Sequence, residues 1–67
     1  MVKYDRLWKL LKTKNIRKHD LMGMADFSSA TLTKLNKYEI VALSVIVKIC
    51  KALDCQIEHV MEIAIDE

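Results

Sequence analysis

The 67-residue chain has no proline, one glycine and two cysteines, and aromatic residues make up 6% of it. Proline and glycine interrupt helices, so their scarcity in a chain rich in Leu, Ile, Val, Lys and Glu favours an all-helical domain. No stretch approaches the roughly 18 apolar residues that a membrane-spanning helix needs. Charges are spread through the first residues, which is not typical of a signal peptide. We therefore expect a cytoplasmic protein without a membrane partner.

Few residues are arranged for metal binding or catalysis. Cys50 and Cys55 are expected to be reduced thiols because nothing indicates secretion, and Cys50 falls on the apolar face of a predicted helix. His19 and His59 stand at no recognised ligand spacing, so we expect no metal site. The chain has no phosphate-binding glycine loop and no nucleophile beside a base. We expect no catalytic residue, no cofactor and no enzymatic activity.

Charge is divided unevenly along the chain, although the formal net charge is only +2. Met1 to Tyr38 contain nine basic and three acidic residues, a net charge of +6, whereas Glu39 to Glu67 contain two lysines and six acids, a net charge of −4. A basic half that faces phosphates is the pattern expected of a DNA-binding protein. A lysine-rich surface that is merely solvated would give the same pattern.

Apolar residues recur at helical spacing in five segments, which predicts a compact all-α domain of five helices over residues 1–67. The first helix is expected to begin at a capping Asp5 and to end before a left-handed Asn15. The tail from Ala64 to Glu67 fits a helix end or a strand. The predicted helices cover residues 5–14, 18–24, 28–36, 43–53 and 56–63. The predicted core consists of Leu7, Leu10, Leu11, Ile16, Leu21, Met24 or Ala25, Phe27, Leu32, Leu35, Leu43, Ile46, Ile49, Cys50, Leu53, Ile57, Val60 and Met61.

The segment from Leu21 to Leu35 is the most informative part of the sequence. It predicts a short helix, a three-residue turn at Ala25–Phe27, a Ser28 cap and a second helix. The second helix has a thin apolar stripe and an outer face of small polar residues with one lysine: Ser29, Ala30, Thr31 and Lys34. The major groove of DNA admits such a helix and offers hydrogen-bond partners to these side chains. The pattern indicates a helix-turn-helix.

Beyond this motif, two stretches carry a family resemblance: Tyr4-Asp5-Arg6-Leu7-Trp8-Lys9-Leu10-Leu11 and Ile49-Cys50-Lys51-Ala52-Leu53-Asp54-Cys55. With them the chain resembles the Cro and phage-repressor type of helix-turn-helix protein, the xenobiotic-response-element family, and within it the very small bacterial regulators. The resemblance implies that the third helix enters the major groove and that the second lies across it. The implied DNA-contacting residues are Lys18, Ser28, Ser29, Ala30, Thr31, Thr33, Lys34, Asn36 and Lys37. Arg17, just before the second helix, is a further candidate for a phosphate contact.

The chain departs from the family pattern at several positions. Met22 stands where the family usually has a small residue that lets the two motif helices approach, and Gly23 beside it would relieve the crowding that Met22 causes. Asp26 stands where the turn usually has glycine. Arg17 and Ala42 replace the usual Ser or Thr helix caps, and each missing cap costs about 1 kcal/mol. These departures predict a domain of modest stability.

The function predicted from the sequence is sequence-specific binding of double-stranded DNA in transcriptional regulation, as a repressor. We expect a homodimer, with Val45, Val47, Ile63 and Ile65 as the interface. The alternative is a protein-interaction module, such as an antitoxin or accessory subunit, that grips a protein partner at the C-terminal end. A polar and basic outer face on the third helix favours DNA.

Overall fold

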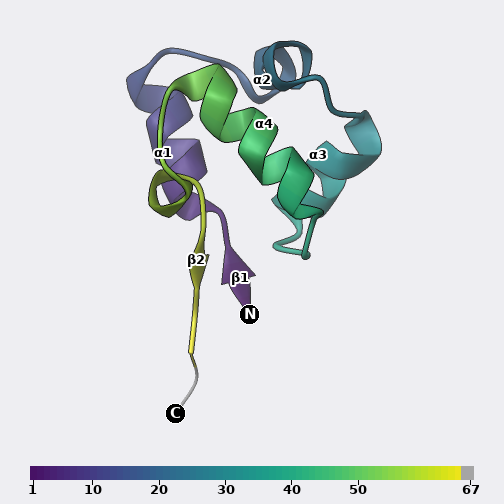
Figure 1. The fold of residues 1–67 in the computed structure, drawn as a ribbon, viewed down its shortest axis with the longest axis vertical. Coiled ribbons are helices and arrows are strands. Elements are labelled where there is room, and N and C mark those ends of the chain that lie inside the picture. The colour runs from purple at the N-terminus through teal and green to yellow at the C-terminus, as the bar shows by residue number, and fades with distance from the viewer. Residues whose placement is uncertain (66–67) are drawn as a thin grey trace.

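The computed structural model describes residues 1–65 and contains four α-helices, one 3₁₀ turn and two short strands in that part of the chain. In chain order these are β1 (Val2–Lys3), α1 (Asp5–Thr13), α2 (Lys18–Ala25), α3 (Ser29–Asn36), α4 (Leu43–Leu53), the 3₁₀ turn η1 (Ile57–His59) and β2 (Glu62–Ile63). In Figure 1, α4 crosses the middle of the molecule with α1 on one side and α3 on the other, and α2 lies above it. No helix among the described residues is long and apolar enough to cross a bilayer.

The core forms where α1, α2, α3 and α4 meet. Leu7, Leu21, Leu35, Ile49 and Val60 are completely buried, and burial of each such side chain contributes about 1.5–3 kcal/mol. The sequence left Met24 and Ala25 as alternatives, and Ala25 is the buried one. The complete set of buried residues is Tyr4, Leu7, Leu11, Leu21, Ala25, Leu35, Ile46, Ile49, Leu53 and Val60.

Several predicted core positions lie at the margin of this cluster instead. Leu10, Ile16, Phe27, Cys50 and Met61 are half-buried and pack against it. Leu43 and Ile57 were also expected inside, but both are exposed.

The helix ends agree closely with local sequence signals, with one exception at Asp5. Asn15 and Asp26 have positive φ of 58° and 54°, as expected for residues that end α1 and α2. The expected Asp5 cap is wrong, because Tyr4 is the N-cap and Asp5 is the first helical residue. The Asp5 carboxylate instead accepts a hydrogen bond from the Tyr38 hydroxyl. Lys14, predicted as the last helical residue, is the C-cap of α1.

The predicted fifth helix over residues 56–63 is wrong, although the domain is mostly helical as expected. This segment forms only η1 and then β2, which pairs antiparallel with β1 in the register Val2 to Ile63 and Lys3 to Glu62. Pairing with residues at the other end of the chain satisfies the backbone groups that a helix would have satisfied internally. Ala64 and Ile65 continue beyond β2 without a helix, and residues 66–67 of the predicted tail lie outside the described residues.

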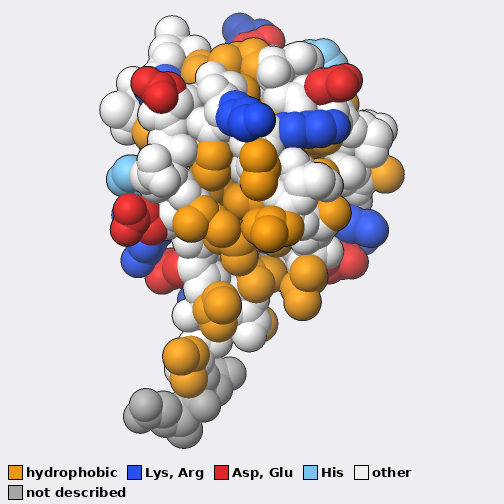
Figure 2. All heavy atoms as spheres, in the orientation of Figure 1, with side chains coloured by type: hydrophobic (Ala, Val, Ile, Leu, Met, Phe, Trp, Pro, Cys, Tyr) orange, Lys and Arg blue, Asp and Glu red, His pale blue; other side chains and the backbone are white. Residues whose placement is uncertain are grey.

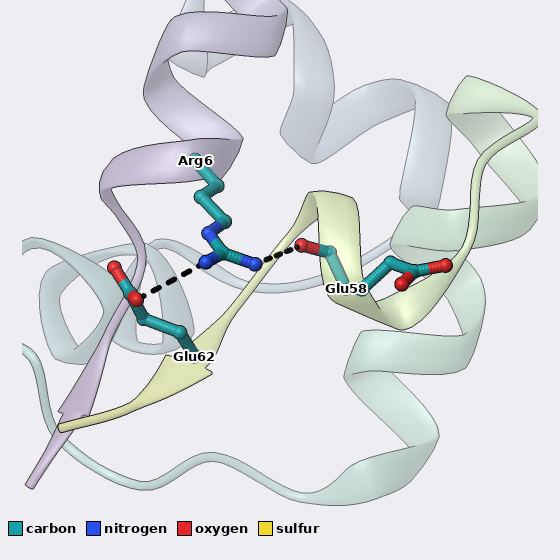
Figure 3. A network of polar contacts seen from close by, with 3 residues as sticks. All are labelled: Arg6, Glu58 and Glu62. Atoms are coloured by element: carbon teal, nitrogen blue, oxygen red, sulfur yellow. Dashed lines mark hydrogen bonds and ion pairs between the residues drawn. The ribbon is translucent and has the colours of Figure 1, made fainter. Parts of the chain in front are cut away.

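Arg6 ties the C-terminal segment to α1 (Figure 3). Its guanidinium donates one hydrogen bond to the Glu58 backbone carbonyl at 3.1 Å and forms an ion pair with the Glu62 carboxylate at 3.3 Å. Both side chains of the ion pair are substantially exposed, so the pair contributes at most about 1 kcal/mol. The two contacts hold η1 and β2 against α1.

Candidate nucleic-acid interface

The turn between α2 and α3 is held by backbone geometry and by one side chain of α4. Asp26 is left-handed, and the backbone N–H of Phe27 donates to the Met22 carbonyl at 3.2 Å. The Lys48 ammonium donates to the Asp26 carbonyl at 3.2 Å, which fixes the turn against α4. Glycine is usual at such a position, and an L-residue there costs roughly 1–2 kcal/mol. The turn therefore keeps its geometry despite Asp26.

The neighbouring departures from the family pattern cause no clash. Met22 is half-buried, and Gly23 is exposed on α2. A Cβ added at Gly23 would meet nothing within 4 Å, so this glycine does not relieve crowding between the motif helices. The missing side-chain cap at Arg17 is partly replaced, because its backbone N–H donates to the Asp20 carboxylate at 3.3 Å. Ala42 has no side-chain cap bond.

Ser28 starts α3 as predicted. Its hydroxyl oxygen accepts a hydrogen bond from the backbone N–H of Thr31 at 3.3 Å and shares a second one with the Thr31 hydroxyl at 3.2 Å. Thr31 is consequently half-buried against the cap rather than fully presented to solvent, which corrects the expectation from the sequence. Its contribution is to order the first turn of α3.

The outer face of α3 is formed by small polar side chains and one lysine. Ser29, Ala30, Thr33 and Lys34 are exposed, whereas Leu35 on the opposite side is completely buried. The Thr33 hydroxyl donates to the Ser29 carbonyl at 3.0 Å, so its oxygen remains available as an acceptor. One buried anchor thus orients a helix whose other side is open to a large partner.

Two sequence-predicted residues, Lys18 and Asn36, are brought together at the flank of this face. The Lys18 ammonium donates to the Asn36 side-chain oxygen at 2.7 Å, which links the start of α2 to the end of α3. The same ammonium lies 4.1 Å from the centre of the Trp8 ring on α1. The other two predicted flanking cations, Arg17 and Lys37, are the N-cap of α2 and the C-cap of α3, and both are exposed.

Sequence reasoning missed three residues that shape this surface. The Trp8 ring contacts the Lys18 ammonium, and Lys48 hydrogen-bonds the turn at the Asp26 carbonyl. Tyr38 hydrogen-bonds Asp5. The Tyr38 hydrogen bond to Asp5 raises the pKa of the Tyr38 phenol. Each contact joins residues of different elements, from 10 (Trp8 and Lys18) to 33 (Tyr38 and Asp5) positions apart, so no local spacing signals it. Within residues 1–65, no three His, Cys, Asp or Glu side chains gather as a potential metal site.

Comparisons with known proteins agree with this geometry. A family model described as the Cro/C1-type HTH DNA-binding domain matches residues 6–65. Among solved structures, the chain is similar to the crystal structure of the transcriptional regulator VanUg, form II, with a TM-score of 0.88 and 38% sequence identity. That match covers 91% of this chain and 81% of the other. No curated protein matches the chain.

Proposed function

Because the chain belongs to the Cro/C1-type helix-turn-helix DNA-binding family, we propose that it regulates transcription by inserting α3 into the major groove of double-stranded DNA. The observation that carries the proposal is the outer face of α3, where Ser29, Ala30, Thr33 and Lys34 are exposed while Leu35 anchors the helix in the core. The similar solved structure is that of a transcriptional regulator, which supports the same role.

Base recognition in this proposal falls to the exposed side chains of α3. Lys34 can donate to O6 or N7 of guanine, and the methyl group of Ala30 can contact a thymine methyl. The hydroxyl of Ser29 can meet a donor or an acceptor, and the Thr33 oxygen can accept. These contacts are few and not bidentate, so one domain discriminates modestly between half-sites.

The residues at the flanks would bind the phosphate backbone. Arg17, Lys18 and Lys37 supply positive charge at the ends of α2 and α3, and Asn36 supplies an amide beside Lys18. Neutralising each phosphate releases counterions, so the logarithm of the binding constant should fall with the logarithm of salt concentration with a slope of roughly −0.9 per contact. The basic Met1–Tyr38 half supports the same arrangement.

We further propose that the protein acts as a homodimer. Hydrophobic side chains form a broad area on the face drawn in Figure 2, over α4 and toward the strand pair. Exposed hydrophobic side chains also line two hollows of the surface, one lined in part by Leu43, Val47 and Ile57 and a second lined in part by Ile40 and Ile63. All five side chains are exposed, whereas Val45 from the predicted interface packs against the core. A second copy would cover this surface and present two copies of α3 to a two-fold symmetric operator.

Repression is the direct consequence of a dimer that occupies promoter DNA and blocks access to it. The proposal keeps the cytoplasmic location and the absence of enzymatic activity expected from the sequence, and what supports it is the DNA-binding family to which the chain belongs. The alternative, a protein-interaction module, would use the same exposed apolar side chains at the C-terminal end, including Ile65.

The test is fluorescence-anisotropy binding to a pool of labelled short duplexes at several salt concentrations. We compare the wild-type protein with the double variant Lys18→Ala/Lys34→Ala. The matched control is Lys9→Ala/Lys12→Ala, which removes the same charge from two exposed positions on α1, outside both the α2–α3 surface and the proposed dimer surface. We expect the affinity of the wild-type protein to fall with salt concentration. Lys18→Ala/Lys34→Ala should lower the affinity at least ten-fold, and the control variant should keep most of it.

Two results would contradict the proposal. Equal losses in the two double variants would mean that binding follows net charge rather than the α2–α3 surface. No wild-type binding at low salt would favour the protein-partner function instead.

A further inference from the structure

Trp8 lies outside the helix-turn-helix, yet it contacts the side chain that joins both motif helices. It stands on α1, half-buried, with the centre of its ring 4.1 Å from the Lys18 ammonium on α2. Lys18 in turn donates to the Asn36 oxygen on α3 at 2.7 Å. Three helices thus contribute one group each to a cluster at the flank of the proposed DNA-binding face.

The cluster restricts a side chain that is otherwise flexible. A lysine has a long stem, and fixing it in one rotamer costs conformational entropy. The electron-rich face of an indole attracts an ammonium, and the Asn36 oxygen accepts one of its protons. Much of the ordering of Lys18 is therefore complete before DNA arrives.

The cluster also leaves a defined set of hydrogen-bond donors. The Lys18 ammonium has three N–H donors and gives one to Asn36, so two remain for the Trp8 ring face and a ligand. The oxygen of the Asn36 amide is occupied by this bond, which leaves the amide NH₂ as its donor group. An ammonium and an amide NH₂ side by side match the several acceptor oxygens of one phosphate group.

We propose that Trp8 is a positioning residue of the DNA interface, which holds Lys18 beside Asn36 so that the two bind one backbone phosphate together. This inference rests on the proposed function. Trp8 does not touch the phosphate itself, and its effect passes through Lys18. Because it is the single tryptophan of the chain, its fluorescence also reports directly on the ammonium beside its ring.

A double-mutant cycle separates this role from ordinary packing. Trp8→Met keeps an apolar side chain without the ring, and Lys18→Met removes only the charge. Because Trp8 orders Lys18 before DNA binds, Trp8→Met should make DNA binding pay for that ordering and weaken the affinity for a labelled duplex about two- to five-fold. In the Lys18→Met background the same change should have almost no effect. Trp8→Phe should retain part of the affinity.

The matched control is the same cycle between Trp8 and Lys37, the C-cap of α3. Lys37 is an exposed cation for which no ring contact occurs among the described residues, so its effect should add to that of Trp8→Met. Additive effects for both Trp8 pairs, with wild-type binding intact, would overturn the inference. Absence of wild-type binding would overturn the proposed function itself.

Fluorescence keeps the inference testable if Trp8→Met fails to fold. Titration of the wild-type protein with duplex should change the Trp8 emission, because the Lys18 ammonium beside the ring then binds a phosphate. Lys18→Met should lose most of this change, and Lys37→Met should keep it. An equal emission change in both lysine variants would contradict the positioning role.

Discussion

The helix-turn-helix (residues 18–36) and the terminal region (residues 1–3 with 56–65) differ in where they place their large apolar side chains. In the helix-turn-helix, Leu21, Ala25 and Leu35 are buried and the outer face of α3 is small and polar. In the terminal region Val60 is completely buried, but Ile63 and Ile65 are 68% and 80% exposed.

The difference shows which surface is suited to which partner. Each motif helix uses one narrow apolar stripe for the core and leaves its other side to a polar, charged ligand. In the terminal region Val2 and Ile63 pair directly and so share one side of the strand pair, and Ile63 and the following Ile65 are exposed without a protein layer over them in the described monomer. Exposed apolar surface of this kind is typical of a protein–protein contact.

The largest effect on stability is expected from placing a charge in the apolar stripe of α3. Leu35→Asp would place a carboxylate at a position that is 0% exposed, and an unpaired buried charge costs more than about 4 kcal/mol. We expect loss of the cooperative thermal transition measured by circular dichroism. Leu43→Asp is the control, because Leu43 is 66% exposed and the change should leave the domain folded. Cooperative melting of Leu35→Asp near the wild-type temperature would contradict the core assignment.

A charge in the uncovered apolar surface should next separate the protomers. Val47 is exposed on α4, and Val47→Lys would place an ammonium in the proposed dimer interface. We expect the dimer dissociation constant, measured by sedimentation equilibrium, to rise at least ten-fold, about 1.4 kcal/mol. Met24→Lys, at an exposed position on α2, should leave it unchanged. A wild-type monomer at tens of micromolar without DNA would count against the dimer.

A smaller effect is expected at Tyr4, the N-cap of α1, which lies between the two regions and is bonded to the loop before α4. Its hydroxyl donates to the Glu39 carbonyl at 2.6 Å, and such a bond contributes about 1 kcal/mol. Burial raises the pKa of the Tyr4 phenol above its ordinary value of 10.0, offset in part by a backbone hydrogen bond from Val41. Tyr4→Phe should lower the free energy of unfolding at pH 7 by about 1 kcal/mol.

The raised pKa also sets a pH dependence. Above pH 10.0 the unfolded chain releases the Tyr4 proton more readily than the folded protein, so stability should fall as pH rises through and beyond that value. Urea unfolding at pH 8, 10 and 11 measures this loss. Tyr4→Phe should reduce the loss, and an unchanged pH dependence would show that the phenol does not contribute.

The smallest effect is a gain in stability at Gly23, on the polar side of α2. Alanine is favoured over glycine in a helix interior by about 0.5–1 kcal/mol. The φ angle of Gly23 is not positive, and an added Cβ meets nothing within 4 Å. Gly23→Ala should raise the melting temperature by several degrees. A lower melting temperature would mean that α2 is constrained in a way that the monomer does not reveal.

The same two regions differ in how far sequence predicts them. The Ser28 cap, the left-handed Asp26 and the bounds of α4 all follow from signals within a few residues, and all three predictions are confirmed. The terminal region depends on pairing between residues about 60 positions apart, which helical periodicity cannot reveal. The helix predicted for residues 56–63 fails for that reason.

The proposed DNA interface shows the same limit. Exposure of Ser29, Ala30 and Lys34 follows from their place on α3 opposite Leu35, which periodicity predicts. The contact of Lys18 with Trp8 depends on how α1 packs beside α2, and only the tertiary arrangement reveals it. Sequence therefore predicts which side chains face outward better than it predicts which of them meet.

The most direct test of the central claim is methylation interference on an operator selected from the duplex pool. Dimethyl sulfate methylates guanine N7 in the major groove and adenine N3 in the minor groove, so it distinguishes the two surfaces of the duplex. If α3 enters the major groove, N7 methylation at a few guanines should block binding, with the effect weakened in Lys34→Ala, and N3 methylation should be tolerated. Interference at N3 alone would contradict insertion of α3 into the major groove.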